Sequence, residues 1–296
     1  MTKTVFRLVY VDFYSDEPEA LANYYQEALG FSLTEEKDGV YYLSSGYDHH
    51  NIVVTKSDKK GVKSYGYQWN PKDSLEDIQA HLKEHGYDSE IVENEKPGVE
   101  RFVRLQDPAG NGVDLLTEMS QTDTGFTRQG VGAMKLGHVA FNAENFAETY
   151  KFYMDALGFV FTDKIGEEFA NFLTCNIDHH VINMISAERT ALHHIAFELK
   201  DSSQQYTASD ILSQQGIDTI WGPSRHTAGS NIASYHHDTD GHVIELYTDM
   251  DKYIPELDLF EPRPWHVELP YKPKTWESLS VWGTEFDMDL GAIKGV

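Results

Sequence analysis

Two histidines and one glutamate in the second half of the chain have the side chains best suited to hold a metal ion. His138 and His194 occur in the apolar runs LGHVAF and LHHIAF, and Glu245 occurs in the apolar run HVIELY. A carboxylate buried in an apolar strand needs a partner. Two neutral imidazoles and one carboxylate on one face of a divalent ion form the ligand set of non-haem iron oxygenases, which leaves positions open for a bidentate substrate and O2. These residues therefore predict a metal centre.

The chain repeats itself at a long period, so its first half serves as an internal control. Residues 7–31 and 135–159 are similar and both end in Ala-Leu-Gly-Phe, and the run DPAGNGVD at 107–114 corresponds to DTDGHVIE at 238–245. Repeats in a solenoid have about 20–50 residues, so the longer period here indicates a duplicated domain. The polar, glycine-containing stretch at 120–132 is typical of a linker between the two copies.

The two copies differ at the three candidate ligands. When SYGYQW is paired with LHHIAF, the first copy has Tyr10, Gly66 and Asp114 where the second has His138, His194 and Glu245. Since one copy does without the histidines, the fold does not require them, and a functional role is favoured over a structural one. The two histidines stand near the start of equivalent strands, so all three side chains can meet in one hollow if two modules close face to face.

Hydrophobic periodicity predicts the elements that position these residues. An amphipathic helix is expected over 142–157, because Phe146, Tyr150, Tyr153 and Leu157 recur at spacings of three and four. A second helix is expected over 203–215, and strands are expected near 136–141, 159–163, 168–175, 180–186, 192–199, 218–221, 231–237 and 242–247. The order β-α-β-β-β thus occurs twice in this copy.

The predicted fold class is α+β, with four βαβββ modules paired into two homologous barrel-like domains. We expect an N-terminal domain without metal at 1–130 and a metal-binding catalytic domain at 131–250. Residues 251–296 fall outside the repeat, and their prolines and tryptophans favour an extended tail that wraps a surface.

The alternation of side chains along a strand gives a further expectation. Successive residues of a strand face opposite sides of its sheet. His193 is therefore expected to point away from His194, and His242 away from Glu245.

Composition limits the possible partners. The chain has 24 lysines and arginines against 48 aspartates and glutamates, which gives a net charge of −24. A surface this negative repels nucleic acid and anionic membranes, so we expect neither as a partner. No window approaches the roughly 20 apolar residues of a membrane span. The single cysteine, Cys175, excludes an intramolecular disulfide and a zinc site built from cysteines. We expect a cytoplasmic protein, because this usage fits a reducing cytosol, although it fits a secreted protein without disulfides almost as well.

Over nearly its whole length the chain resembles the type I extradiol dioxygenases, which are similar to catechol 2,3-dioxygenase and belong to the vicinal oxygen chelate superfamily. The strings LGHVAF, LHHIAFEL and DGHVIELYTD resemble that family's ligand-bearing strands. The resemblance implies that His138, His194 and Glu245 bind Fe(II), with Mn(II) as an alternative that the ligand types do not exclude. It also implies ring cleavage of a catechol-type diol by O2, to a product of the 2-hydroxymuconic semialdehyde type, and a homo-oligomer.

The same resemblance implies three further catalytic residues. His180 in CNIDHHVIN matches the family's acid–base histidine, although His179 beside it leaves open which of the two faces the metal. His226 and Tyr235 match the histidine and tyrosine that hydrogen-bond the bound diol. An imidazole titrates near pH 6.5, so His180 can accept and return a proton.

Other functions of the same superfamily stay open as alternatives. They are a glyoxalase-like isomerase, an antibiotic-modifying transferase and a metal-free drug-binding protein. The first two usually draw on more carboxylate or glutamine ligands from paired modules, and the last needs no ligand triad. Which catechol would be accepted, and the number of subunits, do not follow from the sequence.

Overall fold

The computed structural model describes residues 4–122 and 129–285. Part of the predicted linker, 123–128, and the last residues of the predicted tail, 286–296, lie outside the described residues. The division into 1–130, 131–250 and 251–296 stays a prediction.

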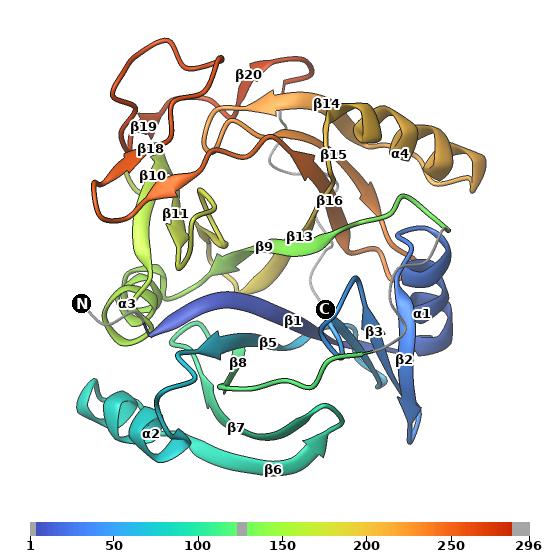
Figure 1. Ribbon diagram of the computed structural model, residues 1–296, viewed down its shortest axis with the longest axis vertical. Helices are drawn as coiled ribbons and strands as arrows, with labels where there is room; N and C mark the ends of the chain where they lie inside the picture. The colour runs from blue at the N-terminus through green and yellow to red at the C-terminus, as the bar shows by residue number, and fades with distance from the viewer. Residues whose placement is uncertain (1–3, 123–128, 286–296) are drawn as a thin grey trace.

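The first half of the chain forms one curled eight-stranded sheet with two helices (Figure 1). Its elements are β1 (Val5–Ser15), α1 (Pro18–Glu27), β2 (Ser32–Lys37), β3 (Val40–Ser44), β4 (Ile52–Lys56), β5 (Gly61–Trp69), α2 (Leu75–Glu84), β6 (Glu90–Lys96), β7 (Val99–Gln106) and β8 (Gly112–Leu116). The strand order is β2-β3-β4-β1-β5-β8-β7-β6. Each βαβββ module therefore supplies one half of the sheet, and the first strands of the two modules, β1 and β5, pair antiparallel at its centre.

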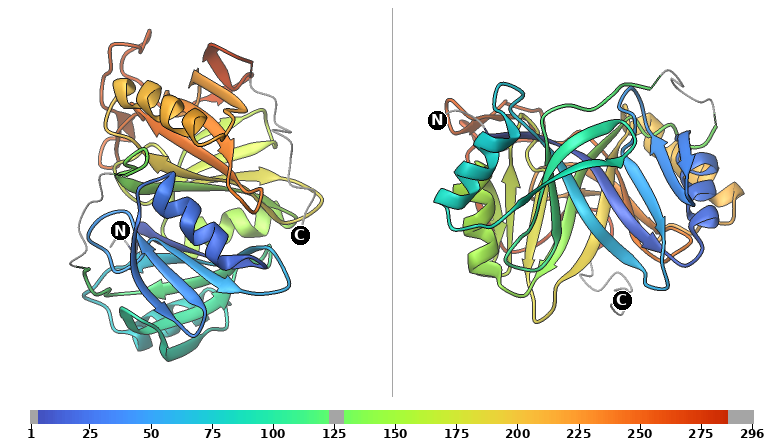
Figure 2. Two further views of the ribbon diagram at one scale, coloured as in Figure 1. Left: turned by 90° about the vertical axis from the view of Figure 1, so that its right-hand side faces the viewer. Right: turned by 90° about the horizontal axis from the view of Figure 1, so that it is seen from below.

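The second half repeats this plan in a ten-stranded sheet (Figures 1 and 2). Its elements are β9 (Lys135–Ala143), α3 (Phe146–Lys151), a π-helical turn η1 (Phe152–Ala156), β10 (Val160–Ile165), β11 (Ala170–Thr174), β12 (Ile182–Ser186), β13 (Ala191–Glu198), α4 (Ser202–Gln214), β14 (Trp221–His226), β15 (Ile232–His237) and β16 (Val243–Thr248). Its strand order is β19-β10-β11-β12-β9-β13-β16-β15-β14-β20, in which β19 (Thr275–Trp276) and β20 (Ser280–Trp282) come from the tail. The predicted α+β class with four βαβββ modules is confirmed.

Two predicted elements differ from the structure. Residues 142–143 continue β9, because Asn142 still pairs with Ile185 and Ala191, so the helix begins later, at Phe146. The strand expected near 218–221 runs instead over β14. A bulge removes Pro223 from the pairing with β15, so a residue without an N–H donor is tolerated within the strand.

The tail lies along the second sheet and reaches both of its edges. It contains β17 (Tyr253–Ile254), β18 (Leu259–Phe260), β19 (Thr275–Trp276) and β20 (Ser280–Trp282). β19 pairs with β10 at one edge, and β20 pairs with β14 at the other. The segment between β19 and β20 therefore bridges the two edges of the curled sheet.

A shared apolar core joins the two halves and explains the apolar strings around the candidate ligands. Tyr65 of β5 stacks on Phe141 of β9, with ring centroids 5.8 Å apart, and Ile195 and Phe197 of β13 belong to the same cluster. Alternate residues of β9 and β13 must then face the hollow of the second sheet, and His194 is one of them. None of the described helices is long and apolar enough to span a membrane.

Candidate metal centre

The three candidate ligands meet in the hollow of the second sheet. Nε2 of His138 lies 3.1 Å from Oε2 of Glu245, Nε2 of His194 lies 3.0 Å from the same oxygen, and the two nitrogens are 3.4 Å apart. All three side chains are buried. Ligands at right angles on an octahedral ion with bonds of about 2.1 Å lie about 3.0 Å apart. The donor set and its spacing therefore fit a divalent ion bound on one face.

Three neighbouring strands bring these residues together. β13 lies between β9 and β16, and in the ladder Ala196 pairs with His138 on one side and with Glu245 on the other. Because the side chain of Ala196 is small, the longer side chains on either side can converge above it. The same alternation directs His194, two residues earlier on β13, to the same face.

Glu245 is a buried carboxylate without a fixed cation. Its Oε2 accepts a hydrogen bond from Tyr235 at 2.8 Å, and its Oε1 accepts one from Asn231 at 2.8 Å. Burial would raise the pKa of Glu245, but the imidazoles of His138 and His194 hold it well below the usual value. Among the described residues no lysine or arginine forms an ion pair with Glu245. An ionised, buried carboxylate needs a positive partner, and a metal ion would supply it.

Of the adjacent pair His179 and His180, it is His180 that lines the cavity. Its ring centroid lies 4.2 Å from that of His138, and its Nδ1 is 2.9 Å from Nδ1 of His179. His179 faces away and contacts Asp163. Burial lowers the pKa of His180 well below 6.5, so the free imidazole is neutral at pH 7.

His226 and Tyr235 lie at the same cavity, on β14 and β15. The Tyr235 hydroxyl, which donates to Glu245, lies 2.9 Å from Nε2 of His226. Nδ1 of His226 lies 3.0 Å from the carbonyl oxygen of Leu279 in the tail, which orients the ring. Burial lowers the pKa of His226, and burial together with Glu245 raises that of Tyr235, so at pH 7 the ring is neutral and the phenol keeps its proton.

The expected orientation of His193 is wrong. His193 also lines the cavity, and its Nδ1 lies 2.7 Å from Nδ1 of His194. The register of β13 against β9 shifts between Leu192 and His194, and this irregularity breaks the strict alternation. His242 does face away from the cavity, packed against Phe13.

The expected pairing of Gly66 with His194 is also wrong. In the first sheet Gly66 pairs with Asp114, and in the second sheet Ala196 pairs with Glu245, so Ala196 is the counterpart of Gly66. The counterpart of His194, two residues earlier, is Ser64. Both sheets have the register shift at the same place, so GVKSYG at 61–66 corresponds to ALHHIA at 191–196, and the expected pairing was two residues out of step.

The cavity combines nitrogen and oxygen donors with an apolar wall. Its lining residues are His138, Phe172, His180, Asn183, His193, His194, His226, Ala228, Asn231, Tyr235, Glu245 and Leu279. Asn183, His193 and Asn231 were not expected from the sequence. Asn231 begins the predicted strand 231–237, where an amide opposite the candidate ligands is the signal that could have identified it.

Comparisons with known proteins find relatives of this chain. The model of the "Glyoxalase/Bleomycin resistance protein/Dioxygenase superfamily" matches residues 7–115 and 135–246. Metapyrocatechase 2 of Cupriavidus necator is 29% identical over 122 residues, 41% of this chain and 38% of that protein. A 1,2-dihydroxynaphthalene dioxygenase of Pseudomonas sp. (strain C18) is 28% identical over 244 residues, 72% of this chain and 80% of that protein. The first of these matches thus spans well under two thirds of its relative.

Solved structures share the fold. The 2,3-dioxygenase LapB from Pseudomonas sp. KL28 has a TM-score of 0.82 and 22% identity, over 94% of this chain and 99% of that one. A Mn(II)-bound glyoxalase from Novosphingobium aromaticivorans also has a TM-score of 0.82, with 21% identity, over 97% of this chain and 93% of that one. At these identities the likeness supports the fold and does not choose between the two activities.

Proposed function

Since the chain belongs to the glyoxalase/bleomycin resistance protein/dioxygenase superfamily, we propose that it is an extradiol dioxygenase. It cleaves a catechol-type ring beside the two hydroxyls with O2, at an Fe(II) or Mn(II) ion held by His138, His194 and Glu245. The observation that carries this proposal is the meeting of their three ligand atoms, within 3.0–3.4 Å of one another, in a cavity also lined by His180, His226 and Tyr235.

When bound, the divalent ion supplies a Lewis acid and a template that brings the diol and O2 together. The protein supplies the proton transfers. His180 is neutral and lies beside His138, so it accepts the proton of the second hydroxyl and later returns it to oxygen. Tyr235 and His226, hydrogen-bonded to each other, hold the diol oxygens in place.

The wall of the cavity favours an uncharged substrate. Among the described residues that line it, none is a lysine or an arginine, so a carboxylate on the substrate would lack a counter-ion. Phe172, Ala228 and Leu279 offer an apolar surface for a ring and its alkyl or aryl substituents. We therefore propose a catechol without an acidic side chain as the substrate.

A glyoxalase-like isomerase is the alternative, because a Mn(II)-bound glyoxalase shares the fold. It is the weaker candidate, because the tyrosine and histidine that would hold a diol stand next to the ligands here.

We also propose that the enzyme works in a reducing cytosol, with Cys175 buried, and forms homo-oligomers through exposed apolar residues of the tail, such as Leu257, Val267 and Leu269.

The test is an assay of the full chain after anaerobic loading with Fe(II) or Mn(II). Catechol and a 3-alkylcatechol, supplied with O2, should give a yellow ring-fission product with matching O2 uptake, and a chelator should abolish both. A catechol with a carboxylate side chain should react more slowly. Loaded protein that leaves catechols intact but isomerises the glutathione adduct of a 2-oxoaldehyde would establish the alternative.

A further inference from the structure

A buried chain of polar side chains leads from the tail to His180. Asp163 of β10 is fully buried, and its Oδ2 lies 3.1 Å from Nε2 of His179. Nδ1 of His179 lies 2.9 Å from Nδ1 of His180, which lines the cavity. None of the proposed roles of the site requires Asp163 or His179.

Contacts from the tail determine which group donates the hydrogen bond between Asp163 and His179. Trp276 donates its Nε1–H to Oδ2 of Asp163 at 2.7 Å, and the backbone N–H of Lys274 donates to Oδ1 at 2.6 Å. Both oxygens of the Asp163 carboxylate thus accept hydrogen bonds. An ionised carboxylate can only accept, so Nε2 of His179 must carry a proton.

The next link follows from the chemistry of imidazole. A neutral imidazole has one N–H and one bare nitrogen. With its proton on Nε2, a neutral His179 has a bare Nδ1, which can only accept the hydrogen bond from His180. The proton of His180 then lies on Nδ1, and the bare nitrogen is Nε2, on the side of the ring turned away from His179.

Packing holds the pair in this orientation. The ring of His179 stacks on Phe260 of the tail, with centroids 5.0 Å apart and planes 19° apart. Gly229 has a φ of +80°, and a Cβ added there would lie 3.1 Å from Nδ1 of His179 and 3.2 Å from Cε1 of His180. The backbone thus lies directly against the two rings, which leaves them little freedom to turn.

The first half has a looser copy of the same chain. Nδ1 of His49 lies 3.1 Å from Nδ1 of His50, and Nε2 of His49 lies 3.5 Å from Oε2 of Glu35. The side chain of Glu35 is 40% exposed, whereas that of Asp163 is fully buried. The pair of histidines is therefore inherited, and the buried acid with its two donors from the tail is particular to the half with the cavity.

We propose that Asp163 and His179 are positioning residues that keep the proton of His180 on Nδ1, so that Nε2 faces the cavity as a proton acceptor. This inference rests on the proposed function, in which His180 transfers a proton. A catalytic imidazole held in the wrong tautomer loses up to about 10⁴-fold in rate in a Ser-His-Asp triad, so a device that fixes the tautomer has a large effect.

The first test reads the tautomer without any turnover. ¹⁵N NMR of the histidine side chains in the full chain, loaded with diamagnetic Zn(II), separates protonated from bare ring nitrogens. The expected result is His180 with a protonated Nδ1 and a bare Nε2. The proposal is overturned if His180 has a protonated Nε2 and a bare Nδ1. A cationic His179 would cause this, because its own Nδ1 would then donate to Nδ1 of His180.

The second test uses matched variants. His179→Phe keeps a ring against Phe260 but removes the acceptor, so the tautomer of His180 should become mixed and kcat should fall about 100-fold. His179→Asn places an oxygen near the position of Nδ1 and should restore both the tautomer and most of the rate. The control His49→Phe, in the first half, should change neither.

The outcomes separate the two proposals. If wild-type protein cleaves no catechol, the proposed function fails while the NMR result still stands. If it cleaves catechol but His179→Phe keeps the wild-type rate and tautomer, this inference fails alone. If His179→Phe does not fold, the wild-type tautomer and the His179→Asn variant still decide.

Discussion

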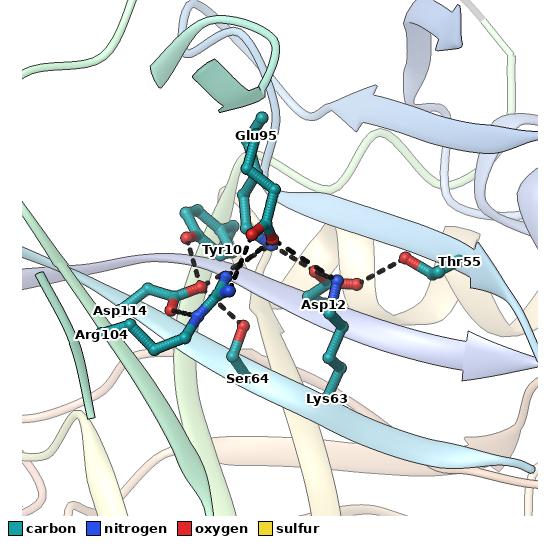
Figure 3. Close-up of polar contacts among 9 residues, drawn as sticks. Tyr10, Asp12, Thr55, Lys63, Ser64, Glu95, Arg104 and Asp114 are labelled. Atoms are coloured by element: carbon teal, nitrogen blue, oxygen red, sulfur yellow. Dashed lines mark hydrogen bonds and ion pairs between the residues drawn. The ribbon is translucent and has the colours of Figure 1, made fainter. Parts of the chain in front are cut away.

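The two halves of the molecule solve the same electrostatic problem in different ways. In the first half, Tyr10, Ser64 and Asp114 occupy the positions of the candidate ligands in the second half. Tyr10 donates to Oδ2 of Asp114 at 2.9 Å, and Ser64 donates to the same oxygen at 2.8 Å (Figure 3). In both halves, two side chains from neighbouring strands thus contact one oxygen of a buried carboxylate.

Fixed cations balance the carboxylates of the first half. Lys96, which is buried, donates to Asp12, and its Nζ lies 3.7 Å from Oδ2 of Asp114. Arg104 donates from Nε to Oδ1 of Asp114 at 2.9 Å and also pairs with Glu95 (Figure 3). Arg104 pairs with Asp114 in the ladder as Tyr235 pairs with Glu245, so an arginine stands where the second half has a tyrosine.

The difference shows how a duplicated fold keeps or loses a metal site. The first half balances the charge of Asp114 within the chain, which leaves no need for an ion. The second half presents Glu245 to neutral imidazoles, a phenol and an amide, which leaves a negative charge for an ion to balance. The two carboxylates should therefore respond in opposite ways to neutral substitution.

The largest effect is expected from Glu245→Gln. This change removes the one charged ligand. Loss of a residue that only hydrogen-bonds a ligand lowers metal affinity by up to about 100-fold, so the affinity for Fe(II) and Mn(II) should fall by more than that. Ring cleavage should be lost with it. Metal content after reconstitution and gel filtration, measured by mass spectrometry, checks the result. Retention of one ion per chain would contradict the assignment of Glu245 as a ligand.

The matched change in the first half, Asp114→Asn, should lower the stability of the fold and leave metal binding unchanged. It removes the carboxylate that Lys96 and Arg104 share, but Lys96 keeps Asp12 and Arg104 keeps Glu95, so the cost should be about 1–3 kcal/mol, less than for a lone buried charge. The free energy of unfolding, measured in urea, should fall by that amount, while metal content per folded chain stays at the wild-type value. A large loss of metal with unchanged stability would remove the distinction between the halves.

Replacing Tyr235 by Phe should have an intermediate effect. The change removes a hydroxyl that donates to Glu245 at 2.8 Å, and a hydrogen bond to a charged group contributes about 1.5–3 kcal/mol. We expect kcat/KM for catechol to fall roughly 10- to 100-fold while the metal is retained. Wild-type kinetics would show that the hydroxyl does not contact the diol.

The smallest effect concerns a turn that contains a histidine in one half alone. Nδ1 of His242 lies 2.8 Å from Oδ2 of Asp238, and the equivalent turn pairs Asn111 with Asp107 at 2.9 Å. Burial would lower the pKa of His242, but Asp238 raises it above 6.5 in the folded protein. The pair therefore stabilises the fold fully below about pH 6.5, and this contribution is lost as the pH rises through the raised pKa.

His242→Asn copies the turn of the first half and should remove this dependence. The wild type should be more stable than the variant by about 1 kcal/mol below pH 6.5, and the difference should narrow at alkaline pH. Urea unfolding of both proteins across this range measures it. A difference that grows with pH would mean that the pKa is lowered instead.

Local patterns were sufficient to predict the main features of the site. His138, His194 and Glu245 stand in apolar strings whose alternate residues belong to the shared core, and the duplication gave each string a counterpart. One prediction failed where geometry departs from regular alternation, because the register shift in β13 turns His193 into the cavity. The other failed because the two strings were paired two residues out of step, which made Gly66 instead of Ser64 the counterpart of His194.

Contacts between distant segments were beyond prediction from the sequence. Trp276 meets Asp163, and the carbonyl of Leu279 meets His226, because the tail returns to both edges of a curled sheet. The sequence around these residues contains no pattern that predicts the path of the tail. The ion pair of Lys96 with Asp12 in the first half could not be predicted for the same reason, because the two residues are far apart in the sequence.

The contrast between the halves implies that the second half binds one divalent ion and the first half binds none. Anomalous diffraction from a crystal of the Mn(II)- or Fe(II)-loaded full chain, recorded at the absorption edge of the metal, tests it most directly. We expect a single peak per chain, within bonding distance of Nε2 of His138, Nε2 of His194 and Oε2 of Glu245. A peak beside Asp114, or no peak between the two histidines and Glu245, would contradict it.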